Sequence, residues 1–130
     1  MQHDRFVGLV QDRAQLGARD AAESATRATL ETLGARLDAG MAENLAAQLP
    51  PEIGLHLREA DDQAEPFGLD EFRRRLAQRE TSNVDEATAE SHARVVLSVV
   101  EEAITGDALD RARQQLPPEF SELFEFGAVR

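Results

Sequence analysis

Two long segments of the chain place apolar side chains every three or four residues, which is the spacing of one face of an α-helix. The segment 84–105 has the stronger pattern, made by Ala93, Val96, Leu97, Val100 and Ile104. The segment 20–38 has a matching stripe made by Thr26, Leu30, Leu33 and Leu37. The length of both segments favours helix over strand. Because the residues around the first stripe are smaller, we expect that helix to be less deeply enclosed than the second.

The second half of the pattern copies the first. Leu-Pro-Pro-Glu at residues 49–52 recurs at residues 116–119, and Glu23 and Arg27 recur at the same offset as Glu90 and Arg94. Each copy predicts four helices in the order short, long, short, short. We therefore expect an all-α fold of two pseudo-symmetric four-helix repeats, residues 4–57 and 69–124. An acidic linker, residues 58–68, joins them, and the repeats pack into one helical bundle-like domain spanning residues 1–130.

The double proline predicts a corner between the third and fourth helices of each copy. A residue before proline avoids the α region, so the third helix ends by Leu49 or Leu116. The second proline suits the first turn of a new helix, where its missing N–H is no loss. Gly40 and Gly106 follow the long segments, where we expect left-handed helix caps.

Composition excludes several kinds of chemistry. All 14 basic residues are arginine and there is no Cys, so lysine Schiff bases, thiol nucleophiles and thiolate metal sites are absent. The net charge of −11 argues against nucleic acid as a partner. No apolar stretch is long enough to cross a membrane. The apolar run at residues 6–10 is too short for a secretory signal, so we expect a soluble, cytoplasmic protein of a GC-rich bacterium.

The polar residues of the long segments are the candidate binding residues. Glu23 precedes Arg27 by four residues, as Glu90 precedes Arg94, so each pair either forms an ion pair within its helix or lines a cleft between the copies. His92 is either a buried, hydrogen-bonded histidine or a proton-transfer group.

Other motifs favour structural explanations. His56 follows Glu52 by four residues, but no Glu-x-x-His occurs, so we expect no metal site and no cofactor. The arginines at residues 73–75 are typical of the solvated face of a short helix. No nucleophile elbow or phosphate-binding loop is present, so we expect no catalytic residues, and an enzyme is the least favoured reading.

The duplicated Leu-Pro-Pro-Glu, together with the segment Ala22–Leu33 ahead of its first copy, resembles a bacterial family known as domain of unknown function 2267. The resemblance runs from Phe6 to Phe124. It implies an all-helical fold and brings no catalytic residues.

Two functions remain open at this point. The first is a non-catalytic module for protein interaction or self-association, which predicts an exposed apolar patch. The alternative is a bundle that binds a small ligand or a metal at a polar site between the two long helices, which predicts a polar-lined cavity there.

Overall fold

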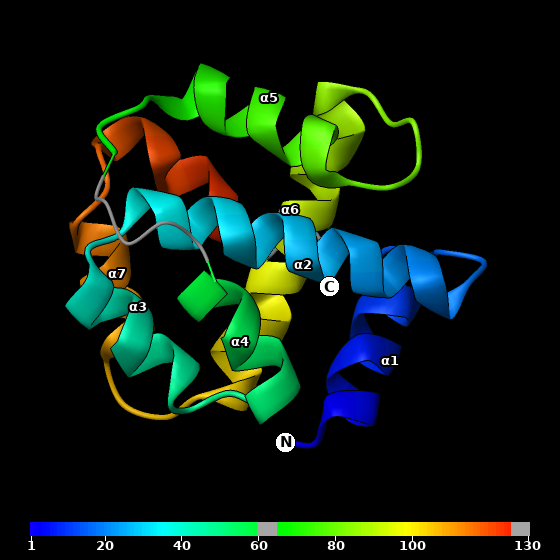
Figure 1. Cartoon of the computed structure of the whole chain (residues 1–130), viewed down its shortest axis with the longest axis horizontal. Helices are drawn as coiled ribbons and strands as arrows, with labels where there is room; N and C mark the ends of the chain where they lie inside the picture. Colours follow the sequence, from blue (N-terminus) through cyan, green and yellow to red (C-terminus); the bar gives the residue numbers. More distant parts are fainter. Residues whose placement is uncertain (60–64, 126–130) are drawn as a thin grey trace.

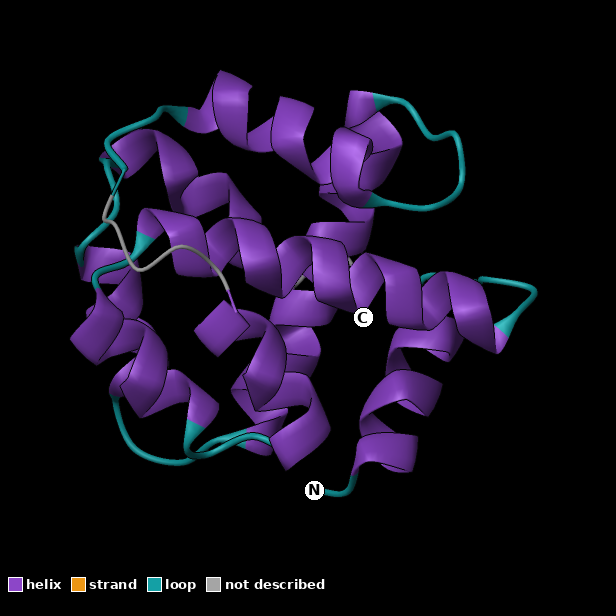
Figure 2. Cartoon of the chain, in the orientation of Figure 1, coloured by secondary structure: helices purple, strands orange, loops and turns teal. Residues whose placement is uncertain are grey.

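The fold is all-α, as the sequence predicts. The computed structural model describes residues 1–59 and 65–125, and within these ranges it contains helices and no strand (Figures 1 and 2). The elements in chain order are α1 (His3–Arg13), α2 (Arg19–Arg36), α3 (Ala39–Ala46), α4 (Pro51–Glu59), α5 (Leu69–Arg79), α6 (Glu86–Ala103), α7 (Ala108–Gln114) and the 3₁₀ helix η1 (Pro118–Phe124). We call residues 1–59 the first half and residues 65–125 the second half.

The contacts between helices come in matching pairs around the two long helices. Helices α2 and α6 pack against each other in the middle of the molecule (Figure 1). Helix α1 packs against both of them, and so does its counterpart α5. Helix α4 lies on α2 as η1 lies on α6, and α3 contacts α7. Each half therefore buries its apolar faces partly against the other.

Two glutamines tie the halves together in a reciprocal way. The backbone N–H of Thr105, just beyond α6, donates to Gln48 Oε1 at 3.1 Å. The backbone N–H of Asp38, just beyond α2, donates to Gln115 Oε1 at 3.4 Å. Gln48 and Gln115 are counterparts in the two copies of the sequence. Each therefore caps the chain that leaves the long helix of the opposite half.

Helix α2 is as enclosed as α6, so the expectation of a less buried first long helix is wrong. Eleven of its 18 residues are buried, against ten of 18 in α6. Small side chains such as Ala25 and Ala28 are almost completely buried. Because α2 contacts α1, α4, α5 and α6, small residues allow close approach of its neighbours rather than marking an exposed face.

The Leu-Pro-Pro-Glu corners form as predicted, with Pro51 opening α4 and Pro118 opening η1. In the second half the corner has an added role, because Glu119 Oε2 accepts a hydrogen bond from the backbone N–H of Leu69 at 3.0 Å. Leu69 is the first residue of α5, whose N-cap Gly68 has no side chain to satisfy that N–H. The corner thus also secures the start of a neighbouring helix.

The helix ends differ from the sequence prediction at several points. Gly106 has a positive φ of 75°, but Gly40 lies inside α3, because α2 ends earlier and Asp38 caps α3 through Met41 N–H. Helix α4 continues to Glu59, two residues beyond the predicted repeat boundary. Residues 60–64 of the predicted linker lie outside the described residues. Among the described helices, none has the length and apolar character needed to span a membrane.

The close approach of α3 and α4 yields a stability prediction. A Cβ atom on Gly54 would lie 2.6 Å from the backbone oxygen of Ala46, whereas one on Gly8 would meet nothing within 4 Å. Gly8→Ala should raise the free energy of unfolding by about 0.5–1 kcal/mol, because alanine is the better helix former. Gly54→Ala should instead lower it by about 1–3 kcal/mol, because the backbone of α3 must shift.

Urea unfolding followed by circular dichroism measures both changes. Equal stabilisation by the two substitutions would contradict the tight α3–α4 contact.

Candidate functional site

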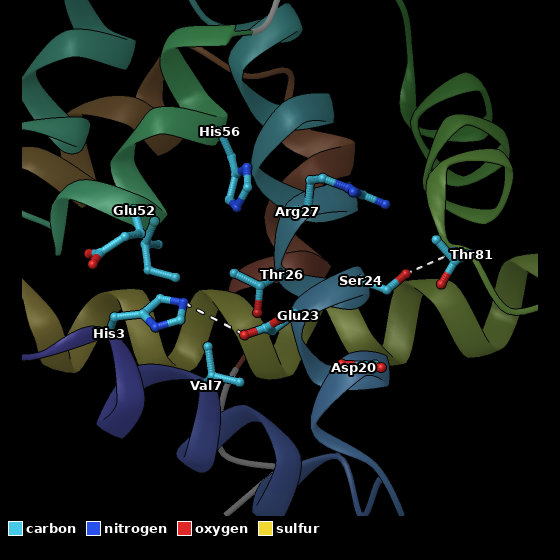
Figure 3. A pocket seen from close by; sticks show the side chains of 11 residues that line it. His3, Val7, Asp20, Glu23, Ser24, Thr26, Arg27, Glu52, His56 and Thr81 are labelled. Atoms are coloured by element: carbon cyan, nitrogen blue, oxygen red, sulfur yellow. Dashed lines mark hydrogen bonds and ion pairs between the residues drawn. The ribbon is translucent and has the colours of Figure 1, made fainter.

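A polar pocket opens in the first half between α1, α2 and α4 (Figure 3). Its volume is about 500 Å³, within the usual range for small-molecule sites. Its charged and imidazole side chains come from all three helices and are His3, Asp20, Glu23, Arg27, Glu52 and His56. Val7 and Ile53 add apolar surface, and Thr81 reaches it from the connection between α5 and α6. We call this the α1–α2–α4 pocket.

Arg27 is half-buried in this pocket and makes no ion pair or hydrogen bond with a described residue. The predicted pair between Glu23 and Arg27 does not form. The Glu23 carboxylate instead lies 3.8 Å from His3 Nε2 and 3.5 Å from Arg19 Nε. The guanidinium of Arg27 therefore contributes a positive charge to the pocket that no described carboxylate neutralises directly.

Two of the pocket hydroxyls, those of Ser24 and Thr26, are hydrogen-bonded to the backbone. Ser24 Oγ accepts a hydrogen bond from the backbone N–H of Thr81 at 2.8 Å. Thr26 Oγ1 donates to the backbone oxygen of Ala22, also at 2.8 Å. Both side chains hold helices in place, and neither is hydrogen-bonded to a histidine as an activated nucleophile would be.

The corresponding region of the second half is filled by larger or apolar side chains. Arg73 stands where the first half has Val7, Phe120 stands where it has Ile53, and Leu123 replaces His56. Phe120 and Leu123 are fully buried. The two halves therefore share the same arrangement of helices but have different side chains in this region.

Arg73 is the centre of an ion-pair network that we call the Arg73 cluster. Its guanidinium pairs with Glu90 of α6, with Glu122 of η1 and, at 3.1 Å, with Asp70 of its own helix. Arg94 Nη2 also donates to Glu90, at 2.8 Å, so the ion pair predicted within α6 is confirmed. The expectation of a solvated arginine face is thus wrong for Arg73.

Arg75 departs from the solvated face as well. Its guanidinium lies 4.0 Å from the centre of the Phe67 ring and pairs with Glu65 and Glu71. Only Arg74 of the three arginines is exposed.

His92 is a buried, hydrogen-bonded histidine. Its Nδ1 lies 2.9 Å from the Glu80 carboxylate, and the side chains are only 11% and 4% exposed. Glu80 directly follows the end of α5, and His92 lies on α6, so this contact joins the two helices. This is the first of the two roles that the sequence left open.

The five candidate binding residues therefore lie in three different places. Glu23 and Arg27 line the α1–α2–α4 pocket, Glu90 and Arg94 belong to the Arg73 cluster, and His92 pairs with Glu80. The pocket lies between the first long helix and its own short helices, rather than between the two long helices.

Sequence reasoning missed His3 and His56 as pocket residues. His3 is the first residue of α1. The sequence did contain a signal, namely the positions at which the two copies differ. Val7 corresponds to Arg73 in the other copy, and His56 corresponds to Leu123. A position where duplicated sequences differ in charge indicates where one copy has a separate role.

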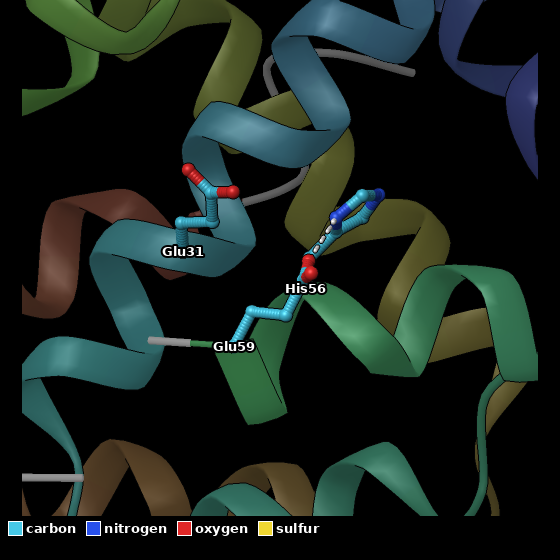
Figure 4. Close-up of side chains that lie close together, drawn as sticks. All are labelled: Glu31, His56 and Glu59. Carbon is cyan, nitrogen blue, oxygen red and sulfur yellow. Dashed lines mark ion pairs between the residues drawn. The ribbon is translucent and has the colours of Figure 1, made fainter. Parts of the chain in front are cut away.

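Burial of the imidazole lowers the pKa of His56. Arg27 and His3 act in the same direction, whereas Glu31 and Glu59 oppose the shift. His56 is therefore neutral near pH 7. Glu31, His56 and Glu59 also form a group of metal-ligand types whose ligand atoms all lie within 4.8 Å of one another (Figure 4).

The fold and site together define an all-α helical protein with a polar pocket in its first half, where the second half has the buried side chains of Phe120 and Leu123. The chain belongs to the family described as "Uncharacterized conserved protein (DUF2267)", whose model matches residues 3–123. The resemblance seen in the sequence is thereby confirmed. A search of curated proteins finds no match.

The lowered pKa of His56 predicts how stability depends on pH. The unfolded chain binds a proton at this histidine more tightly than the folded chain does, so protonation favours unfolding. The contribution of His56 to stability is complete above its unfolded pKa of about 6.5 and is lost as pH falls from there through the lower pKa of the folded state. The urea midpoint should therefore fall between pH 7.5 and pH 5.5, and His56→Gln should reduce this fall.

Both proteins are measured at the same two pH values. The value of pH 7.5 is the reference, because there the wild-type imidazole is uncharged in the folded and the unfolded chain. An identical pH dependence of the two midpoints would show that His56 is not the group responsible.

Proposed function

We propose that this protein binds a small molecule in the α1–α2–α4 pocket and that Arg27 binds an anionic group of that molecule. The observation that supports the proposal is a half-buried guanidinium in a pocket of ligand size that lacks an ion-pair partner among the described residues. Its planar fork matches a carboxylate or phosphate in a bidentate way. Glu23, the predicted partner of Arg27, lies beside His3 and Arg19 instead. A bound anion would therefore provide the negative charge that Arg27 lacks.

The other charges of the pocket narrow the class of ligand. Asp20, Glu23 and Glu52 also line it, so a ligand with several negative charges would be repelled. A molecule with one anionic group and one cationic or hydrogen-bond-donating group fits both signs. Val7 and Ile53 add an apolar surface for its carbon skeleton. We therefore propose an amino-acid-like zwitterion as the ligand class.

A binding role has more support than catalysis. The hydroxyls of Ser24 and Thr26 are hydrogen-bonded to the backbone, and no hydrogen bond joins a pocket hydroxyl to a histidine among the described residues. The imidazoles of His3 and His56 face carboxylates, at 3.8 Å in each case, rather than a hydroxyl. Ligand recognition needs such convergent polar groups without an activated nucleophile.

A second candidate function, protein interaction or self-association, stays a prediction from the sequence, as does the cytoplasmic location. The expected exposed apolar patch has little support in the described residues, where Met1 and Leu55 are the large hydrophobic side chains that are exposed. They are 40% and 48% exposed and come from the chain start and from α4. Isolated exposed side chains of this kind are ordinary on monomers.

Substitution of Arg27 tests the proposal. A thermal-shift screen of amino acids and other small zwitterions should give at least one compound that raises the melting temperature, and calorimetry then measures its affinity. Arg27→Gln should weaken binding at least about tenfold, because a hydrogen bond to a charged group contributes about 1.5–3 kcal/mol.

Arg94→Gln is the matched control. Arg94 is the counterpart of Arg27, but it pairs with Glu90 in the half where this region is filled. The control should lower stability through that pair and leave affinity unchanged. If both substitutions weaken binding equally, or if only multiply charged anions bind, the proposed site is wrong.

A further inference from the structure

His56 also has two carboxylate neighbours, Glu31 and Glu59, that do not line the α1–α2–α4 pocket. Glu31 lies on α2, and Glu59 lies one turn beyond His56 on α4 (Figure 4). His56 Nδ1 is 3.8 Å from Glu59 Oε1, and one ligand atom from each of the three residues lies within 4.8 Å of the others. We call these three residues the His56 cluster. Neither Glu31 nor Glu59 lines the α1–α2–α4 pocket.

The spacing of these atoms is close to that of a coordination shell. Zn²⁺ binds nitrogen and oxygen at about 2.0–2.2 Å, which places two ligands of a tetrahedral ion about 3.4 Å apart. Atoms within 4.8 Å of one another reach that spacing through an inward movement of about 1 Å. Glu59 is exposed and Glu31 is half-buried, so rotation of these two side chains can bring both carboxylates toward His56.

The histidine nitrogen that faces this cluster has an unmet requirement. His56 Nδ1 is buried and has no hydrogen-bond partner among the described residues. A buried polar atom without a partner costs free energy, so native proteins rarely keep one without a reason. An imidazole nitrogen is also the commonest protein ligand of transition-metal ions, so a bound ion would give Nδ1 the partner that it lacks.

We propose that Glu31, His56 and Glu59 form a binding site for a divalent transition-metal ion, with Zn²⁺ as the best match. The two carboxylates balance the charge of the ion, and the imidazole favours zinc over calcium or magnesium, which prefer oxygen ligands alone. Three protein ligands leave one tetrahedral position for water or another molecule, as in open zinc sites. The proposal goes beyond the proposed function and does not depend on it, because Glu31 and Glu59 lie outside the pocket lining.

Metal titration of the tag-free, full-length chain tests the site. Calorimetry with Zn²⁺ should show one ion per chain, and Co²⁺ should give the visible absorption bands of a low-coordinate site. In nitrogen-15 spectra, the Nδ1 resonance of His56 should move on addition of Zn²⁺, because that atom becomes a ligand.

Substitutions separate this cluster from the pocket. Glu31→Gln and Glu59→Gln should each weaken Zn²⁺ binding at least about tenfold, since even loss of an outer-shell partner typically costs 10–100-fold. Glu52→Gln is the matched control, because Glu52 lies one turn before His56 on the same helix but outside the cluster. Arg27→Gln should weaken binding of the zwitterion without weakening Zn²⁺ binding, because it removes a positive charge near His56 and none of the three proposed ligands.

Three results would overturn the proposal. The first is Zn²⁺ affinity in Glu31→Gln and Glu59→Gln equal to that of the wild type. The second is a loss in Glu52→Gln as large as in those two variants, which would place the ion in the pocket. The third is an unmoved His56 Nδ1 resonance at saturating Zn²⁺.

Discussion

The whole structure depends on the contact between the two long helices, α2 and α6. Each short first helix, α1 or α5, packs against both of them, so each half completes the core of the other. The reciprocal hydrogen bonds of Gln48 and Gln115 fix the chain where it leaves these helices. This arrangement requires α2 to accept close neighbours on several sides, and its small residues allow that. The side chains that occupy the spaces between α1, α2 and α4 and between α5, α6 and η1 therefore decide whether a pocket or an ion-pair network forms there.

Equivalent spaces in the two halves have different contents, and this difference carries the functional argument. In the second half, Arg73 neutralises Glu90, and Phe120 and Leu123 fill the remaining volume. In the first half, Val7 and His56 leave a pocket in which Arg27 lacks a partner among the described residues. The second half therefore serves as an internal reference for the first. Because the same helices enclose a filled space in the second half, the open space in the first half is a candidate binding site.

Local sequence patterns predicted the features that depend on local physics. The helices, their order, the Leu-Pro-Pro-Glu corners and the Glu90–Arg94 pair all follow from spacing along one segment. The burial of α2, the pairing of Glu23 with His3 and the role of Arg73 depend on helices that are distant in the sequence, so spacing could not show them. The His56 cluster was missed for the same reason, since Glu31 comes from another helix. The differences between the copies were visible in the sequence, but only the fold shows that they meet in one space.

The most direct test of the central claim is a map of amide chemical shifts while the chain is titrated with the best zwitterion from the screen. We expect the amide shifts around Arg27, Glu52 and His56 to change and those of the counterpart positions Arg94, Glu119 and Leu123 to stay constant. Shifts that change equally around both sets of positions, or only around Arg73, would contradict the claim that the α1–α2–α4 pocket, and not its counterpart region in the second half, is the binding site.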